Sequence, residues 1–214
     1  MLPLVLLGAT EAAGKGQHAL GVVVQGVKPK MPRNADVTLR AKVNWRGPKA
    51  DLSYAWSSVE GPALPSNADS GSTTIVIPKD ELEVGGHYHL RLRVKAEWKD
   101  EEGEPKSTEA TSDVEFDVNA PPRGGKCTLD TRWAGPSQAS LTLGAPGWKD
   151  DDQVQYRYSL LRNGKEVLLH NWSTVTTYKE VTAARPGDTL QAKCGIRDKY
   201  GDGLTALSDP ITRE

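Results

Sequence analysis

The chain has 214 residues, a formal net charge of −1 at pH 7 and 26% charged residues. At this length it forms one large domain or two modest ones, since domains commonly contain about 100–150 residues. The near-zero net charge excludes a global field that would attract nucleic acid or anionic lipid. No apolar run is long enough to span a bilayer. Two cysteines are too few for a four-ligand zinc site of the usual spacing, which leaves one disulfide or two separate thiols.

Residues 1–19 form an apolar leader with two open interpretations. Glycines follow the apolar run Leu2–Leu7, as they do in a phosphate-binding loop. The spacing does not fit, because Gly8 and Gly14 are separated by five residues instead of four, and Gly16 replaces the required Ser or Thr. The apolar run also provides the short h-region of a secretion signal, without the basic residue that normally precedes it. The leader is therefore either a signal remnant or the end of a preceding domain.

Residues 20–119 show the alternation that is typical of half-buried β-strands. Apolar side chains occupy every second position in the segments 37–43, 52–56, 88–94 and 114–118. Such strands have one face toward a core and one toward water, as in antiparallel sheets that are stacked in pairs. The pattern predicts a first β-sandwich over residues 20–119.

The same pattern restarts after the segment 119–125, NAPPRGG. We interpret this segment as a rigid-then-flexible joint, because paired prolines disfavour regular structure and glycines free the chain. Asn163-Gly164 lies between two later strand-like runs and is a strong hairpin signal. About seven short strands in roughly 95 residues is the expectation for an immunoglobulin or fibronectin-type sandwich. The predicted fold class is therefore all-β, with two tandem immunoglobulin/fibronectin-III-like antiparallel sandwiches, the second over residues 120–214.

Each sandwich contains a candidate stabilising feature. Leu82 precedes Tyr88 by six residues with a glycine turn between them, which is the layout of a tyrosine corner. The second sandwich has Leu190 at the equivalent place, so another feature must stabilise it. Cys127 and Cys194 both have the parity of inward positions, on a first and a sixth strand that belong to opposite sheets. A disulfide between them is predicted, with two buried free thiols as the alternative.

Several segments together resemble the receptor-for-egg-jelly (REJ) region of the polycystin family. They are YAWSSVEG, STTIVIPKDELEVGGHYHLRLRV, VNAPPRGGKCTL, WKDDD and IRDKYGDG, which cover about residues 20–212. A cysteine that is common in the family shortly before the Trp-x-Asp segment is absent here, so the family's disulfide connectivity is not carried over. The resemblance implies an extracellular portion of a large membrane protein that is tied to cilia, gametes or adhesion.

Two acidic loops of the second sandwich form a candidate metal site. They contain Asp150, Asp151, Asp152, Asp198 and Asp202, which should gather at one end of the sandwich. Clustered carboxylates bind calcium, which takes six to eight oxygen ligands. The alternative is that these loops are simply polar, and no other cofactor is predicted.

Two further patterns are candidates for a modification and for a metal. Asn171 begins the only N-glycosylation acceptor, Asn-Trp-Ser, and is predicted to lie in a loop between strands, where a glycan fits. His87 and His89 project from one face of a strand, a spacing that suits a metal. No third ligand is predicted nearby, and a solvated polar face explains both histidines equally well.

No catalytic residue is predicted, because the chain has no Gly-x-Ser-x-Gly elbow and no carboxylate pair in a pocket-forming context. We therefore predict a non-catalytic extracellular interaction and spacer module with a protein partner at a cell surface. The resemblance extends this to a ciliary or flagellar membrane and to a polycystin-type channel or adhesion complex. The alternative function is a carbohydrate-binding β-sandwich, in which tryptophans, with Trp148 and Trp172 as the two to replace in a test, and the acidic loops hold a glycan. Nucleic acid is not an expected partner.

Overall fold

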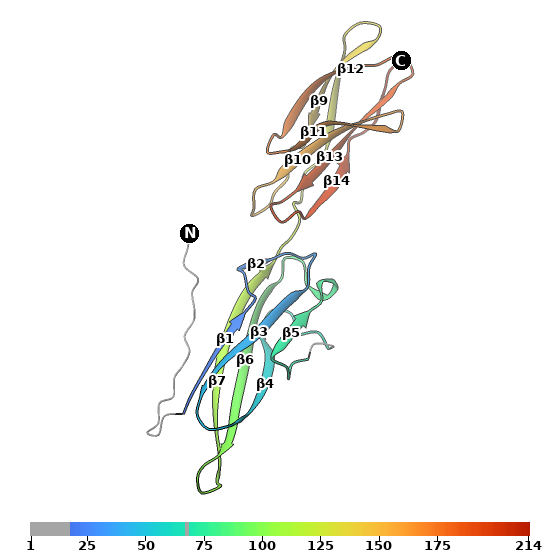
Figure 1. Cartoon of the computed structure of the whole chain (residues 1–214). Helices are drawn as coiled ribbons and strands as arrows, with labels where there is room; N and C mark the ends of the chain where they lie inside the picture. Colours follow the sequence, from blue (N-terminus) through green and yellow to red (C-terminus); the bar gives the residue numbers. More distant parts are fainter. Residues whose placement is uncertain (1–17, 67–68) are drawn as a thin grey trace. The chain divides into compact units, whose positions relative to one another are not determined.

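A computed structural model describes residues 18–66 and 69–214 (Figure 1). Most of the predicted leader, residues 1–17, therefore lies outside the described residues. The chain divides into two compact units, Met1–Asn119 and Ala120–Glu214. Within the described ranges, no helix is long and apolar enough to cross a membrane.

The first unit consists of two sheets. One has the order β1-β3-β5, with β1 (Ala19–Gln25), β3 (Val37–Arg46) and β5 (Thr74–Ile77). The other has the order β2-β7-β6-β4, with β2 (Lys30–Met31), β7 (Pro105–Val118), β6 (His87–Lys99) and β4 (Asp51–Glu60). All pairs are antiparallel except β2 with β7, and a single 3-10 turn, η1 (Lys79–Glu81), precedes β6.

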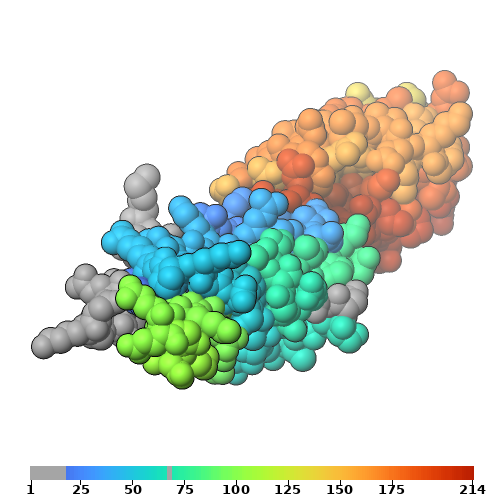
Figure 2. Space-filling model, turned by 60° about the horizontal axis from the view of Figure 1, so that its bottom comes forward, coloured from blue at the N-terminus to red at the C-terminus, as the bar shows by residue number. Residues whose placement is uncertain are grey.

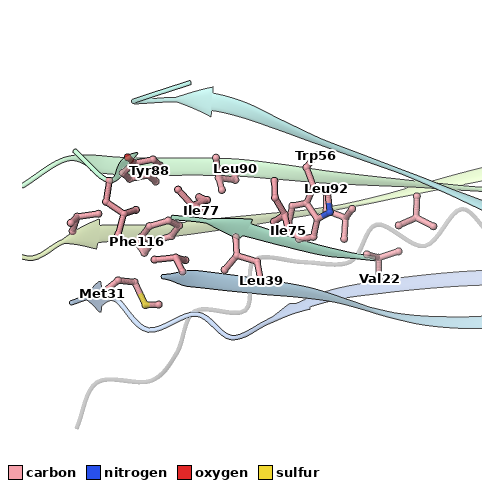
Figure 3. Close-up of a cluster of buried hydrophobic side chains, with 14 of the residues drawn as sticks. Val22, Met31, Leu39, Trp56, Ile75, Ile77, Tyr88, Leu90, Leu92 and Phe116 are labelled. Carbon is pink, nitrogen blue, oxygen red and sulfur yellow. The ribbon is translucent and has the colours of Figure 1, made fainter. Parts of the chain in front are cut away.

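Side chains from both sheets of the first unit meet in one core (Figure 3). The alternating positions of β6 supply Tyr88, Leu90 and Leu92, which are buried together with Leu39 of β3 and Ile75 of β5. Full burial of such an aliphatic side chain contributes about 1.5–3 kcal/mol relative to its exposed state. The apolar alternation in the sequence therefore identifies the side chains that hold this sandwich together.

Strands β6 and β7 are longer than the alternation predicts. They pair continuously from His87 opposite Asp117 to Lys99 opposite Pro105, and the turn that joins them lies at one end of the unit, in green at the front of Figure 2. The inward positions in the first half of β7 are occupied by Thr108, Ala110 and Ser112, all half-buried. These side chains are too small or too polar to produce an apolar alternation, which is why the sequence does not reveal the full strand.

The second unit also stacks two sheets. The three-stranded sheet has the order β12-β9-β8, with β12 (Thr177–Ala183), β9 (Gln138–Gly144) and β8 (Thr128–Trp133). The five-stranded sheet has the order β11-β10-β13-β14, with β11 (Lys165–Ser173), β10 (Gln155–Arg162), β13 (Thr189–Arg197) and β14 (Gly203–Leu207), and β15 (Ile211–Thr212) also pairs with β13. Both units are thus all-β antiparallel sandwiches of the immunoglobulin/fibronectin-III type.

The hairpin between β10 and β11 has the turn that the sequence predicts. Asn163 and Gly164 have φ angles of 48° and 78°, both in the left-handed region. Two such residues between paired strands form a type I′ turn, whose twist matches that of the flanking strands. Asn tolerates this conformation better than most non-glycine residues, so Asn-Gly fixes the register of Arg162 opposite Lys165.

Candidate functional sites

Tyr88 connects the turn before β6 to the core of the first unit. The backbone N–H of Glu83 donates to Tyr88 Oη at 3.0 Å. The Tyr88 ring stacks on Phe116 of β7 with centroids 5.0 Å apart, and Leu82 is buried in the same core. This is the geometry of a tyrosine corner, in which a buried phenol satisfies a backbone donor of its own turn. Its role is structural.

We expect Tyr88→Phe to lower the free energy of unfolding of the first unit by about 1 kcal/mol, because the ring packing is kept while the Glu83 N–H loses its acceptor. Urea denaturation followed by hydrogen exchange of peptides from the first unit measures this change. Tyr54→Phe is the matched control, since Tyr54 is half-buried on β4 and its phenol has no hydrogen bond to a described residue. Equal stabilities of the two variants would contradict the role assigned to Tyr88.

In the second unit, Leu190 stands in place of the corner tyrosine, and Asp188 stabilises the turn before β13 instead. Its carboxylate accepts hydrogen bonds from the backbone N–H of Arg185 at 2.7 Å, from Asn163 Nδ2 at 2.8 Å and from Arg162 Nη2 at 2.6 Å. These bonds tie the turn before β13 to the tip of the β10–β11 hairpin. Sequence reasoning missed this residue and assigned the stabilisation to the cysteines alone. The signal that would have found it is an Asp directly after the Pro186-Gly187 turn.

The same contacts make the second unit sensitive to acid. The Arg185 amide, then Asn163 and Arg162, lower the pKa of Asp188 to about 2. A carboxyl with a depressed pKa stabilises the folded state above its ordinary value near pH 4, and this contribution is lost as the pH falls toward the folded pKa. We therefore expect the denaturation midpoint of the second unit to fall between about pH 4 and pH 2, within the window set by these two values.

Asp188→Asn tests this expectation, and we expect it to flatten that part of the pH profile and to lower stability at pH 7. Asp130→Asn is the control, because Asp130 is exposed on β8 and has no ion pair within the described part of the chain. Urea midpoints at pH 2, 3, 4 and 7 give the comparison. A profile of Asp188→Asn that is as steep as that of the unmodified protein would rule out Asp188 as the titrating group.

A disulfide joins the two sheets of the second unit. Cys127 directly precedes β8 of the three-stranded sheet, and Cys194 lies in β13 of the five-stranded sheet. Their sulfur atoms are 2.03 Å apart, their Cα atoms are 5.7 Å apart, and both residues are buried. Both cysteines of the chain are therefore paired, and neither is a nucleophile.

Aspartate side chains of the two acidic loops accept hydrogen bonds from the backbone of their own loops. Asp150 Oδ1 accepts from the N–H of Asp152 at 2.7 Å, and Asp198 Oδ1 accepts from the N–H of Asp202 at 3.1 Å. An ion pair between Asp152 and Lys199 at 2.5 Å brings the two loops together. The carboxylates thus shape the loops in which they occur.

These carboxylates are not arranged as a metal site. In the part of the chain that the structure describes, no group of three or more His, Cys, Asp or Glu side chains is placed to hold a metal ion. Asp151 is exposed, whereas Asp198 and Asp202 are buried. The calcium hypothesis therefore stays a prediction, and what the structure shows is that carboxylates of the two loops bond to their own backbone and to Lys199.

Asn171 lies within a strand, which corrects the prediction that it occupies a loop. It is exposed on β11, the edge strand of the five-stranded sheet, and its Oδ1 accepts from the N–H of Trp172 at 2.9 Å. The pairing of β11 with β10 shifts register on both sides of Tyr158. These irregularities are bulges, which interrupt the alternation and so hide the end of the strand from sequence reasoning.

Trp148 and Trp172, the tryptophans proposed to hold a glycan, lie against glycines. A Cβ at Gly195 would lie 3.0 Å from the Trp172 ring, and the Arg197 guanidinium stacks over that ring at 4.2 Å from its centroid. Trp148 covers Gly125 even more closely. Both rings are half-buried by these contacts, so neither is a free aromatic platform.

The segment interpreted as a flexible joint is bonded into the second unit. The backbones of Arg123 and Lys149 exchange two hydrogen bonds of 3.0 and 2.9 Å, and the N–H of Lys126 donates to Pro146 O at 3.1 Å. A Cβ at Gly125 would lie 2.3–2.4 Å from three atoms of the Trp148 indole. Gly125 is therefore needed for close packing, a role that the interpretation of the segment as a flexible joint did not include.

The outward face of β6 and β7 carries paired charges. Arg91 makes two hydrogen bonds of 2.7 Å to Asp113, His87 contacts Asp117 at 2.8 Å, and His89 lies 3.4 Å from Asp113. The hydrogen bond to Asp117 raises the pKa of His87, and the one from Arg91 lowers the pKa of Asp113. The two histidines thus belong to a cross-strand charge ladder, which accounts for them without a metal.

The fold is shared with two bacterial adhesin structures. One is a Ca²⁺-stabilised adhesin that helps an Antarctic bacterium to reach out and bind ice, with a TM-score of 0.59 at 12% identity over 95% of this chain and 49% of that one. The other comes from work on host cell surface retention of a 1.5-MDa bacterial ice-binding adhesin, with a TM-score of 0.53 at 11% identity over 94% of this chain and 65% of that one. The chain thus spans about half of the first structure, and at these identities the likeness concerns the fold alone.

The sequence itself matches one family. No curated protein matches it. A family model described as the REJ domain matches residues 33–188. That range includes the tyrosine corner at Tyr88, the 119–127 junction and the Trp148 segment that packs on it. Because the match covers most of the chain and both sandwiches, the chain belongs to the REJ domain family.

Proposed function

We propose that the chain is a non-catalytic extracellular module of a cell-surface or ciliary protein, which acts as a spacer and as a docking unit for a polycystin-type membrane protein or an adhesion complex. The observation that carries the proposal is that the residues typical of the REJ resemblance pack the two sandwiches. Tyr88 holds a turn, Gly125 accommodates Trp148, and Cys127 bridges two sheets. Because these residues are used for packing, a partner would be bound by the exposed faces and strand edges of the sandwiches.

The disulfide supports the extracellular part of the proposal. Disulfides persist in oxidising compartments and are rare in the cytosol. Cys127 and Cys194 are the only cysteines of the chain and they are joined to each other. A buried pair of this kind is typical of secreted sandwich domains.

An affinity experiment tests the docking half of the proposal. The full chain with an affinity tag serves as bait for detergent-solubilised ciliary membranes, and an unrelated tandem fibronectin-type pair of similar size serves as the control bait. We expect mass spectrometry to find a polycystin-type membrane protein enriched on this chain alone. Equal recovery on both baits would end the docking proposal, and recovery of glycans without a protein would favour the carbohydrate-binding alternative.

We also propose that Asn171 carries an N-linked glycan. The side chain is exposed on an edge strand, where a glycan would block pairing of β11 with another sheet. Protein secreted from a eukaryotic cell line should lose mass on treatment with an N-glycosidase. Asn171→Gln, expressed in the same way, should show no mass change on treatment, whereas wild-type protein whose mass does not change on treatment would refute the modification.

A further inference from the structure

Three cations lie in line on the outward face of β3. β3 is the central strand of the β1-β3-β5 sheet (Figure 1). Arg40, Lys42 and Arg46 are exposed on the same side of this strand, and Asn44 lies between the last two. Two residues of an antiparallel strand span about 7 Å, so the first two charges are about 7 Å apart and the third is about 14 Å further along. None of the three forms an ion pair with another described residue.

The neighbouring strands bring no compensating charge to this face. Residues directly opposite each other on paired strands share a face. Gln25 and Thr74 lie opposite Arg40, Val23 lies opposite Lys42, and Ala19 lies opposite Arg46. We call this surface, made by Arg40, Lys42 and Arg46 with Val23 and Val76, the β3 basic face.

The other sheet of the same unit shows the contrast. There, Arg91 is held by Asp113, and Arg93 and His87 also lie beside carboxylates of β7. A cation that is already paired across strands has little to offer an anionic partner. The three cations of β3 thus differ from Arg91, Arg93 and His87, each of which already lies beside a carboxylate.

Apolar side chains accompany the charges. Val23 of β1 and Val76 of β5 are each 42% exposed on the outward side of the sheet. Their positions flank β3 on both sides, since Val76 lies opposite Thr38. A partner that offers only negative charge would leave these two side chains in contact with water.

We propose that the β3 basic face docks an extended acidic polypeptide segment that presents both carboxylates and apolar side chains on the side that faces the sheet. Side chains on the same side of an extended chain repeat every two residues, at the spacing of Arg40 and Lys42. Apolar side chains on that same side of the segment would contact Val23 and Val76. A sulfated polysaccharide would engage the cations but would gain nothing from the valines. The inference rests on the proposed function only in that the partner is a protein.

The test uses the full chain and fluorescein-labelled peptides of 12 residues, with fluorescence anisotropy as the readout. In the first, the Glu/Val peptide, every second residue is Glu or Val with Ser between them, so that both kinds of side chain lie on one face of the extended chain. In the second, the Glu/Ser peptide, Ser replaces each Val. We expect tighter binding of the first peptide, and weaker binding of both in 1 M salt than in 0.1 M, since the Debye length falls from about 10 Å to about 3 Å. This assay does not depend on any ciliary protein, so its failure is distinct from failure of the affinity experiment.

Two variants locate the binding. Replacing Arg40, Lys42 and Arg46 together by Gln should weaken binding of the Glu/Val peptide about tenfold, because each exposed ion pair contributes a factor of about two. Replacing Val23 and Val76 together by Ser should reduce binding of the Glu/Val peptide to the level of the Glu/Ser peptide. Circular dichroism shows that each variant is folded.

The control replaces three exposed cations of the second unit, Lys126, Lys165 and Lys179, by Gln, with the same change in net charge. This variant should bind both peptides as the unmodified protein does. Equal loss in the control and in the β3 triple variant would mean non-specific attraction and would overturn the proposal. Binding of a heparin oligosaccharide without binding of either peptide would overturn it in favour of a glycan.

Discussion

Replacing Cys127 and Cys194 together by Ala is expected to lower the free energy of unfolding of the second unit by about 4 kcal/mol. The bridge closes a loop with a sequence separation of 67 residues. In the chain-entropy model, a cross-link over a loop of this length removes about 4 kcal/mol of conformational freedom from the unfolded state. That is a large part of the stability of a domain of this size, which is typically about 5–15 kcal/mol.

Hydrogen exchange with mass spectrometry on the full chain gives the cleanest measurement, because peptides report on each unit separately. Peptides from β9, β10 and β13 should lose protection in the double variant, while those from β3 and β6 should keep theirs. Thiol titration of the unmodified protein, denatured without a reductant, should detect no free sulfhydryl. Unchanged protection of β13 would show that Asp188 and the core hold the second unit without the bridge.

The sequence predicts the parts of the fold that depend on local pattern. The strong alternation of β6 and β13 reflects inward side chains such as Leu90 and Ala192, which are buried in the two cores. The Asn163-Gly164 turn is equally local, because two residues with positive φ determine it. These features are visible in the sequence because each is decided within one strand or one turn.

Other features depend on partners that are distant in the sequence. Gly125 is needed because it packs against Trp148, which lies 23 residues further along the chain. A Gly-Gly pair considered alone indicates a flexible joint. Asp188 acquires its role from the hairpin tip at Asn163. The placement of Asn171 within β11 is hidden by bulges that break the alternation of this strand. None of these contacts follows from composition or periodicity.

For charged residues, too, the sequence shows the local pattern, whereas the partners become visible only in the structure. The sequence shows that β6 has outward basic residues, but only the register of β7 reveals that Asp113 and Asp117 neutralise them. Conversely, Arg40 and Lys42 look like ordinary solvent-facing residues until β1 and β5 are seen to bring no carboxylate beside them. Strand pairing decides which cations are available to a partner, and therefore where binding is to be sought.

A second large effect on stability is expected from a substitution at Gly125. Its φ lies outside the left-handed region, so alanine fits the backbone, but the added Cβ would lie 2.3–2.4 Å from the Trp148 indole. Atoms at this distance cannot be accommodated unless the ring moves. Overpacking of this kind commonly costs about 1–3 kcal/mol, and we expect Gly125→Ala to destabilise the second unit by about 2 kcal/mol.

The sign of the change decides between close packing and a flexible joint. Alanine in an unstrained joint would be neutral or stabilising, because it reduces the freedom of the unfolded chain. Gly21→Ala in β1 is the control, since its Cβ would meet the nearest atoms at an ordinary 3.8 Å. A double-mutant cycle with Trp148→Leu adds the decisive measurement. If the indole is the obstacle, Gly125→Ala costs much less in the Trp148→Leu background, because neighbouring residues couple. If the two substitutions change the free energy of unfolding additively, or if Gly125→Ala is stabilising, the interpretation of the glycine pair as a flexible joint would be supported instead.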